Sequence, residues 1–93
     1  MDEFPGVVYR SGPAGRRPGL VGGLDVWEVV SIHRGLRSEE RTAEWLSISP
    51  SAVGAALRFY AKHQDEVDQW IRRNDDELAA AERIIRAREA AGS

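Results

Sequence analysis

Apolar positions recur at helical spacing from Asp25 onward and at no earlier point in the chain. In the first such segment Val26, Val29, Val30 and His33 fall at helical spacing. Side chains three and four residues apart share one face of a helix, so this spacing predicts a helix with one buried side. Asp25 is a favourable N-cap and Gly35 a common C-terminal stop, and they give the expected ends of this helix.

Two serines mark the starts of the next two helices. Ser38 precedes two glutamates, whose charges suit a helix N-terminus, and Ser49 precedes Pro50, which tolerates the first helical position. The turn between these helices is only Leu46-Ser47-Ile48-Ser49. The pattern is typical of a helix-turn-helix, and a plain helical hairpin within a small bundle shares it.

The third helix carries an apolar stripe that continues past its expected end. The stripe consists of Val53, Ala56, Leu57, Tyr60, Val67 and Ile71. Gln64 interrupts it, which predicts a break between His63 and Asp65. From about Asp75 the chain is rich in Ala, Glu and Arg, so we expect a helix that has little to bury alone.

These stripes predict a core. We expect six side chains to be mostly buried: Trp27, Val30, Leu46, Val53, Leu57 and Tyr60. If this register is right, Leu57→Ala should cost about 2–5 kcal/mol.

Residues 1–24 hold most of the glycines and prolines of the chain, which excludes a helix there. Two short apolar runs, Val7-Val8-Tyr9 and Leu20-Val21, flank the stretch SGPAGRRPG. This arrangement suits a loose hairpin. The fold class expected is therefore mainly α: a small helix-turn-helix domain, homeodomain-like or winged-helix-like, with a short N-terminal β-ribbon and a C-terminal helical arm. The expected divisions are residues 1–24, 25–63 and 64–93.

The composition bears on how the chain is stabilised and on where in the cell we expect it. The chain has no cysteine, hence no disulfide or thiolate metal site. No apolar run approaches the roughly 20 residues that cross a bilayer, and the start Met1-Asp2-Glu3 lacks the basic and apolar regions of a signal peptide. We expect a cytoplasmic protein without a membrane partner.

The net charge of −2 is unevenly distributed. Residues 1–63 hold eight basic and seven acidic side chains (+1), whereas residues 64–93 hold five and eight (−3). A DNA-binding face would therefore lie in the first part. The start of the third helix offers mainly small residues where base-reading side chains usually stand, so contacts to phosphates are the more natural expectation. The candidates for DNA contact are Arg16, Arg17, Arg34, Arg37, Ser51, Arg58 and Lys62, and ordinary solvated surface residues are the alternative.

No pattern indicates catalysis. His33 and His63 fall on different helices, and no group of side chains has metal-ligand spacing. His33 suits a core or boundary position, and His63 suits a helix end, where the macrodipole favours it. We expect no enzyme activity and no cofactor.

The last stretch has the pattern of a helix that lies in a partner's groove. Leu78, Ala81, Ile85 and Arg88 share one side, with Ile84 adjoining. Adjacent isoleucines are unusual on a free tail, although a frayed, solvated tail is the alternative. The partner-binding candidates are Trp70, Leu78, Arg83, Ile84, Ile85, Arg86 and Arg88.

Residues 16–71 resemble the bacterial domain-of-unknown-function family 433 in the order of their elements. The resemblance rests on the Gly-and-Pro opening at 15–18, the stretch Gly22-Gly23-Leu24-Asp25-Val26, the Ala-rich run 55–61 and the ending DEVDQWI. The chain lacks the Thr-Arg pair that the family usually has after its glycine. The resemblance implies a homeodomain-like or winged-helix-like fold and frequent dimers. It also implies a role as the antitoxin of a toxin-antitoxin pair whose toxin is a PIN-like ribonuclease.

These observations lead to one main hypothesis and two alternatives. The main hypothesis is an antitoxin whose residues 64–93 bind and inhibit the ribonuclease, with Arg83, Arg86 and Arg88 placed to neutralise its metal-binding carboxylates. Residues 1–63 would form the fold and carry both a weak operator-binding surface and the surface of a homodimer. The first alternative is a stand-alone dimeric helix-turn-helix regulator. The second is a structural interaction module without nucleic acid.

Overall fold

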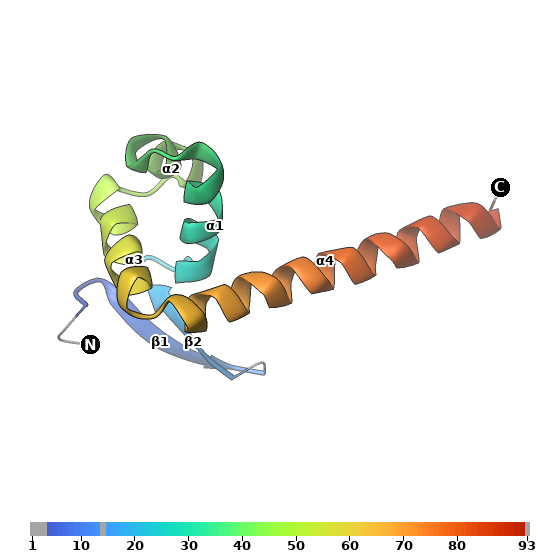
Figure 1. Ribbon diagram of the computed structural model, residues 1–93, viewed down its shortest axis with the longest axis horizontal. Coiled ribbons are helices and arrows are strands. Elements are labelled where there is room, and N and C mark those ends of the chain that lie inside the picture. Colours follow the sequence, from blue (N-terminus) through green and yellow to red (C-terminus); the bar gives the residue numbers. More distant parts are fainter. Residues whose placement is uncertain (1–3, 14, 93) are drawn as a thin grey trace.

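The computed structural model describes residues 4–13 and 15–92. The elements are β1 (Val7–Gly12), β2 (Gly15–Leu20), α1 (Val26–Leu36), α2 (Glu39–Leu46), α3 (Pro50–Lys62) and α4 (Gln64–Gly92). The chain is mainly helical with a small N-terminal hairpin, as expected. Figure 1 shows α1, α2 and α3 gathered into one body, from which α4 projects. Residues 1–3 and 14 of the expected division 1–24, and residue 93 of the expected division 64–93, lie outside the described part.

The hairpin is more regular than the sequence suggested. β1 and β2 pair antiparallel from Val7↔Leu20 to Gly12↔Gly15. The stretch expected to separate two strands thus supplies most of β2. A two-stranded ribbon alone is marginal. This one is stabilised because Val7 and Leu20 are buried in the core and because the Val21 N–H donates to the Gly6 carbonyl over 3.1 Å.

The serine caps of α2 and α3 are confirmed. The Ser38 hydroxyl accepts from the Arg41 N–H (3.2 Å), and the Ser49 hydroxyl accepts from the Ala52 N–H (3.1 Å). Each bond satisfies a backbone donor that has no partner within the helix. Between these helices Ser47 takes a left-handed conformation, with φ 56°, which allows the tight turn.

The expected C-terminal stop of α1 is wrong. Gly35 lies within the helix, which runs to Leu36, and Arg37 adopts the left-handed conformation (φ 54°). Since Ser38 already caps α2, residue 37 alone is left to reverse the chain direction. Its N–H closes the helix by donating to the His33 carbonyl over 2.7 Å.

The core centres on Phe59, which the expected register missed. Of the six side chains predicted to be buried, Val30 and Val53 are, whereas Trp27, Leu46, Leu57 and Tyr60 are only partly buried against the core. The buried face of α3 follows Val53, Ala56 and Phe59. The Phe59 ring stacks on His63 with 4.4 Å between centroids and meets the Phe4 ring edge-on at 5.2 Å. The N-terminal segment therefore decided which aromatic residue of α3 is buried.

The predicted break at residues 63–65 is confirmed, and the chain beyond it forms one helix of 29 residues. His63 ends α3, as expected, and its N–H donates to the Phe59 and Tyr60 carbonyls. Val67 and Ile71 anchor the first two turns of α4 in the core. The remainder extends the molecule to 54 Å in its longest dimension. In the described ranges, no helix combines the length and apolar character that crossing a membrane requires.

Candidate functional site

The outer part of α4 is the most conspicuous surface of this chain. We call residues 72–92 the arm and residues 64–71 the docked segment. At 1.5 Å per residue the arm is about 30 Å long. Its three large apolar side chains are exposed: Leu78 by 56%, Ile84 by 60% and Ile85 by 54%. Figure 1 shows no other element beside the outer turns of α4.

A polar network fixes the direction in which α4 leaves the domain. The Arg34 guanidinium of α1 donates to the Tyr60 hydroxyl of α3 (2.6 Å) and to the Asp68 carboxylate of α4 (2.5 Å). The Tyr60 hydroxyl also donates to Asp68 over 2.9 Å. These bonds lower the pKa of Asp68, with the Tyr60 hydroxyl as the largest cause and Arg34 next, opposed by desolvation. One acidic side chain thus ties three helices together.

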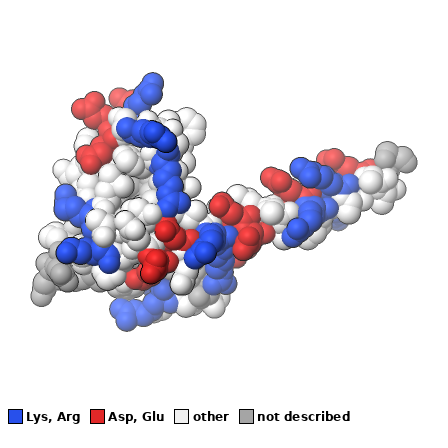
Figure 2. Space-filling model, viewed as in Figure 1, with Lys and Arg blue, Asp and Glu red and all other residues white. Residues whose placement is uncertain are grey.

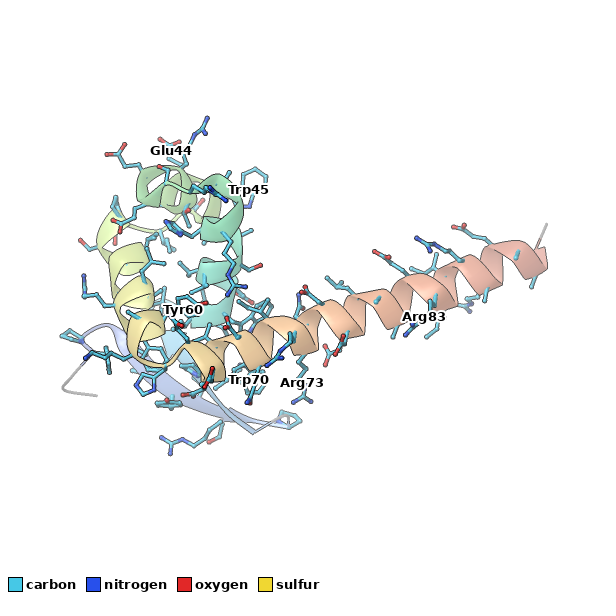
Figure 3. All side chains as sticks on the ribbon, viewed as in Figure 1. Glu44, Trp45, Tyr60, Trp70, Arg73 and Arg83 are labelled. Atoms are coloured by element: carbon cyan, nitrogen blue, oxygen red, sulfur yellow. The ribbon has the colours of Figure 1, made fainter. Side chains whose placement is uncertain are left out.

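A second cluster lies where α4 passes the hairpin. The Asp25 carboxylate lies 2.9 Å from Nε of Arg17 and accepts from the Trp27 indole N–H over 3.1 Å. Asp25 is therefore engaged with side chains and makes no side-chain cap bond to α1. Trp27 and Trp70 line a hollow of about 140 Å³ beside this cluster. Figure 3 shows Trp70 and Arg73 on the side of α4 that is nearer the hairpin.

The structure separates the arginines that were expected to contact DNA. Arg17 and Arg34 are engaged with Asp25 and Asp68, so phosphate contacts would compete with ion pairs that hold the fold. The Arg16 guanidinium lies over the Tyr9 ring, 4.8 Å from its centroid. Arg37 is exposed at the turn between α1 and α2. Arg16 and Arg17 lie on β2, Arg34 lies on α1 and Arg37 follows α1, and no single face is evident from their contacts.

Ser51, Arg58 and Lys62 do share one exposed face of α3. Their spacing of seven and four residues places them in a row, and all three are exposed. The N-terminal segment covers the neighbouring part of α3. Ala55 is buried there, and a Cβ at Gly6 would lie 3.5 Å from the Ala55 Cβ. This helix therefore presents a narrow polar row.

The partner-binding candidates are divided between the two parts of α4. Trp70 belongs to the docked segment, and the Arg73 guanidinium lies 5.5 Å from its ring centroid. The arginines of the arm are all exposed, and the Arg86 guanidinium lies 3.8 Å from the Glu82 carboxylate one turn before it. Figure 2 shows charges of both signs along the arm. Figure 3 places Arg83 far from the domain.

Sequence reasoning missed Trp45 as a surface residue. Its side chain is 70% exposed on α2, beside a shallow hollow that Leu36, Arg41 and Glu44 also line. Figure 3 shows Trp45 at the opposite end of the domain from the root of α4. The buried residues of α2 are Thr42 and Ala43, and Trp45 lies on a different face of this short helix.

Within residues 4–13 and 15–92, no three His, Cys, Asp or Glu side chains are grouped so that they could hold a metal ion. Comparison with family models, with curated proteins and with solved structures finds no match to this chain.

Proposed function

We propose that this chain is an antitoxin: a binding protein whose arm captures and inhibits a PIN-like ribonuclease. The observation that carries the binding role is the arm, a continuous helix that exposes Leu78, Ile84 and Ile85 by more than half of each side chain. Exposed apolar surface of this kind is typical of an interface, and an amphipathic helix fits an apolar groove. The identity of the partner rests on the resemblance to family 433.

The compact domain supports this role by anchoring the arm. Val67 and Ile71 are buried, and the bond from Arg34 to Asp68 adds a polar tie. A helix that is already formed loses less conformational entropy on binding than a disordered segment would. The domain thus acts as the support that presents the arm.

Of the three arginines proposed to reach the nuclease, Arg88 is placed best. It lies three residues after Ile85 and seven after Ala81, on the apolar side of the helix. Arg83 points away from that side, as helical periodicity requires. Arg88 is accordingly the side chain that we assign to the carboxylates of the nuclease.

The test compares the full chain with a chain truncated after Asp75. Each tagged protein is used to recover partners from its native cytoplasm, and RNA cleavage by the recovered partner is then assayed. We expect the full chain to retain a ribonuclease in near-equal amount and to silence it, while the truncated chain does neither. Full inhibition by the truncated chain would rule out the arm as the inhibitor.

A DNA-binding role is the second candidate, and the exposed row Ser51, Arg58 and Lys62 favours it. As a regulator, the chain would bind its operator without a partner and with a strong salt dependence. Reversing the charges at Arg58 and Lys62 should weaken binding to all sequences alike and flatten the salt dependence. Unchanged affinity in this double variant would exclude α3 as the DNA-binding surface.

A further inference from the structure

The docked segment and the arm share one seven-residue pattern. One row consists of Val67, Asn74, Ala81 and Arg88, a second of Ile71, Leu78 and Ile85, and a third of Asp68, Asp75, Glu82 and Glu89. Rows with this repeat stay on one side of a helix. The Ile71 row of the face by which α4 packs on the domain therefore continues along the arm as far as Ile85, while the Val67 row continues as Asn74, Ala81 and Arg88.

The docked segment shows what this face binds. Val67 and Ile71 are buried in the core beside α1, and the acidic residue next to them, Asp68, receives the guanidinium of Arg34. The domain thus offers α4 an apolar surface with a basic side chain at its edge. The arm repeats the same combination, with Leu78 and Ile85 exposed and acidic residues along the same edge.

A second copy of the chain does not supply such a surface through its own arm. In a parallel pair of arms, Glu77 of one copy would face Glu82 of the other, and the two Arg88 side chains would meet in the seam. In an antiparallel pair, Asp75 would face Glu82 or Glu89. Facing charges of like sign destabilise helix pairs, so self-pairing is disfavoured in both directions.

We infer that the arm docks on a partner protein whose apolar groove is edged by Arg or Lys side chains, spaced so as to meet Asp75, Glu82 and Glu89. The inference deepens the proposed function and rests on the binding role of the arm. It states the chemistry that the partner must have. A ribonuclease is compatible with it, because an enzyme that acts on an anionic polymer needs a basic surface.

The hollow between Trp27 and Trp70 marks where the partner's contact begins. Asn74 and Glu77 also line it, and both belong to the first turns of the arm. Glu77 lies 3.4 Å from Arg73 and Glu82 lies 3.8 Å from Arg86, so a basic side chain of the partner would join or replace an exposed pair at Glu82. The docking surface therefore runs from this hollow to Ile85, with the row of Asp75, Glu82 and Glu89 along one side.

The test uses the full chain and two synthetic amphipathic helices. Both peptides carry Ile and Leu along the seam, and one has Lys and the other Glu at the flanking positions. Binding is measured by fluorescence anisotropy of the labelled peptides, and self-association of the chain by sedimentation. We expect a chain that does not self-associate through its arm and that binds the Lys peptide about tenfold or more tightly than the Glu peptide, a ratio that a few flanking ion pairs can supply.

Two variants and one control substitution extend the test. Reversing the acidic row (Asp75→Lys, Glu82→Lys, Glu89→Lys) should transfer the preference to the Glu peptide. Leu78→Asp with Ile85→Asp should abolish binding, whereas Ala87→Asp, on the opposite side of the helix, should leave it unchanged. Circular dichroism of each variant verifies that the arm is still helical.

Equal affinity for both peptides, or binding of neither, would overturn the inference. So would a wild-type dimer that Leu78→Asp dissociates, because the second copy would then be the occupant. Failure of this inference can be distinguished from failure of the antitoxin proposal. A clear preference for the Lys peptide without any ribonuclease partner leaves the surface standing and removes only the identity of its target.

Discussion

The Arg34 guanidinium of α1 and the Asp68 carboxylate of α4 lie 2.5 Å apart, 34 residues apart in the chain. Tyr60 of α3 bonds to both. The contact lies within the docked segment, three residues before the buried Ile71, so it helps to set the direction of the arm. Since the bonds to Tyr60 and Arg34 lower the pKa of Asp68, the contact is also sensitive to acid.

The first prediction concerns pH. A carboxylate whose folded-state pKa is depressed stabilises the fold above its unfolded-state pKa, and this contribution is lost as the pH falls through the folded-state value. For Asp68 the loss should occur below the ordinary Asp pKa of about 3.9. Urea unfolding at several pH values should show wild type more stable than Asp68→Asn at neutral pH, with the two converging in acid.

Asp76→Asn serves as the matched control, because Asp76 is exposed on the arm. It should leave both the stability and its pH dependence nearly unchanged. A constant difference between wild type and Asp68→Asn down to the lowest pH would show that the ion pair does not account for the effect of the substitution.

The second prediction tests the register of α3. Phe59 is fully buried between Phe4, Tyr9 and His63, so Phe59→Ala should cost about 3–5 kcal/mol through lost contacts and a residual cavity. Leu57 is only partly buried, so Leu57→Ala should cost about 1–2 kcal/mol. Chemical denaturation measures both, and a larger cost for Leu57 would contradict the observed packing.

The third prediction compares two glycines whose backbone conformations differ: Gly35 is helical and Gly23 has a positive φ. Gly35 lies inside α1 with open space where a Cβ would stand, so Gly35→Ala should stabilise the protein by about 0.5–1 kcal/mol. Gly23 also has open space, but its φ is +118°. Gly23→Ala should therefore destabilise the protein through backbone strain. Thermal unfolding of the two variants should move in opposite directions.

The fourth prediction concerns the independence of the arm. The last buried side chain of α4 is Ile71, so removing every residue after Asp75 should reduce the helical signal while leaving the urea midpoint nearly unchanged. Truncation after Asp65 removes Val67 and Ile71 and should lower the midpoint markedly, because two core side chains are lost. Equal destabilisation by both truncations would mean that the arm contributes to the fold.

Part of the candidate site could be predicted from residues alone. The break near His63, the helical arm and its apolar side are consequences of spacing, which depends only on neighbours along one helix. The roles of Arg17 and Arg34 could not be predicted, since both have the appearance of free basic residues in the sequence. Their acidic partners lie eight and 34 residues away and meet them only when the hairpin, α1 and α4 pack together.

The sequence by itself determined the helical segments, the serine caps of α2 and α3 and the break before α4, because each depends on interactions among residues a few positions apart. Tertiary structure decided which aromatic residue of α3 is buried and that Trp45 faces outward. It also decided that Arg34 binds Asp68. These outcomes depend on the competition among distant side chains for a small core, and spacing along one helix carries no information about what packs against it.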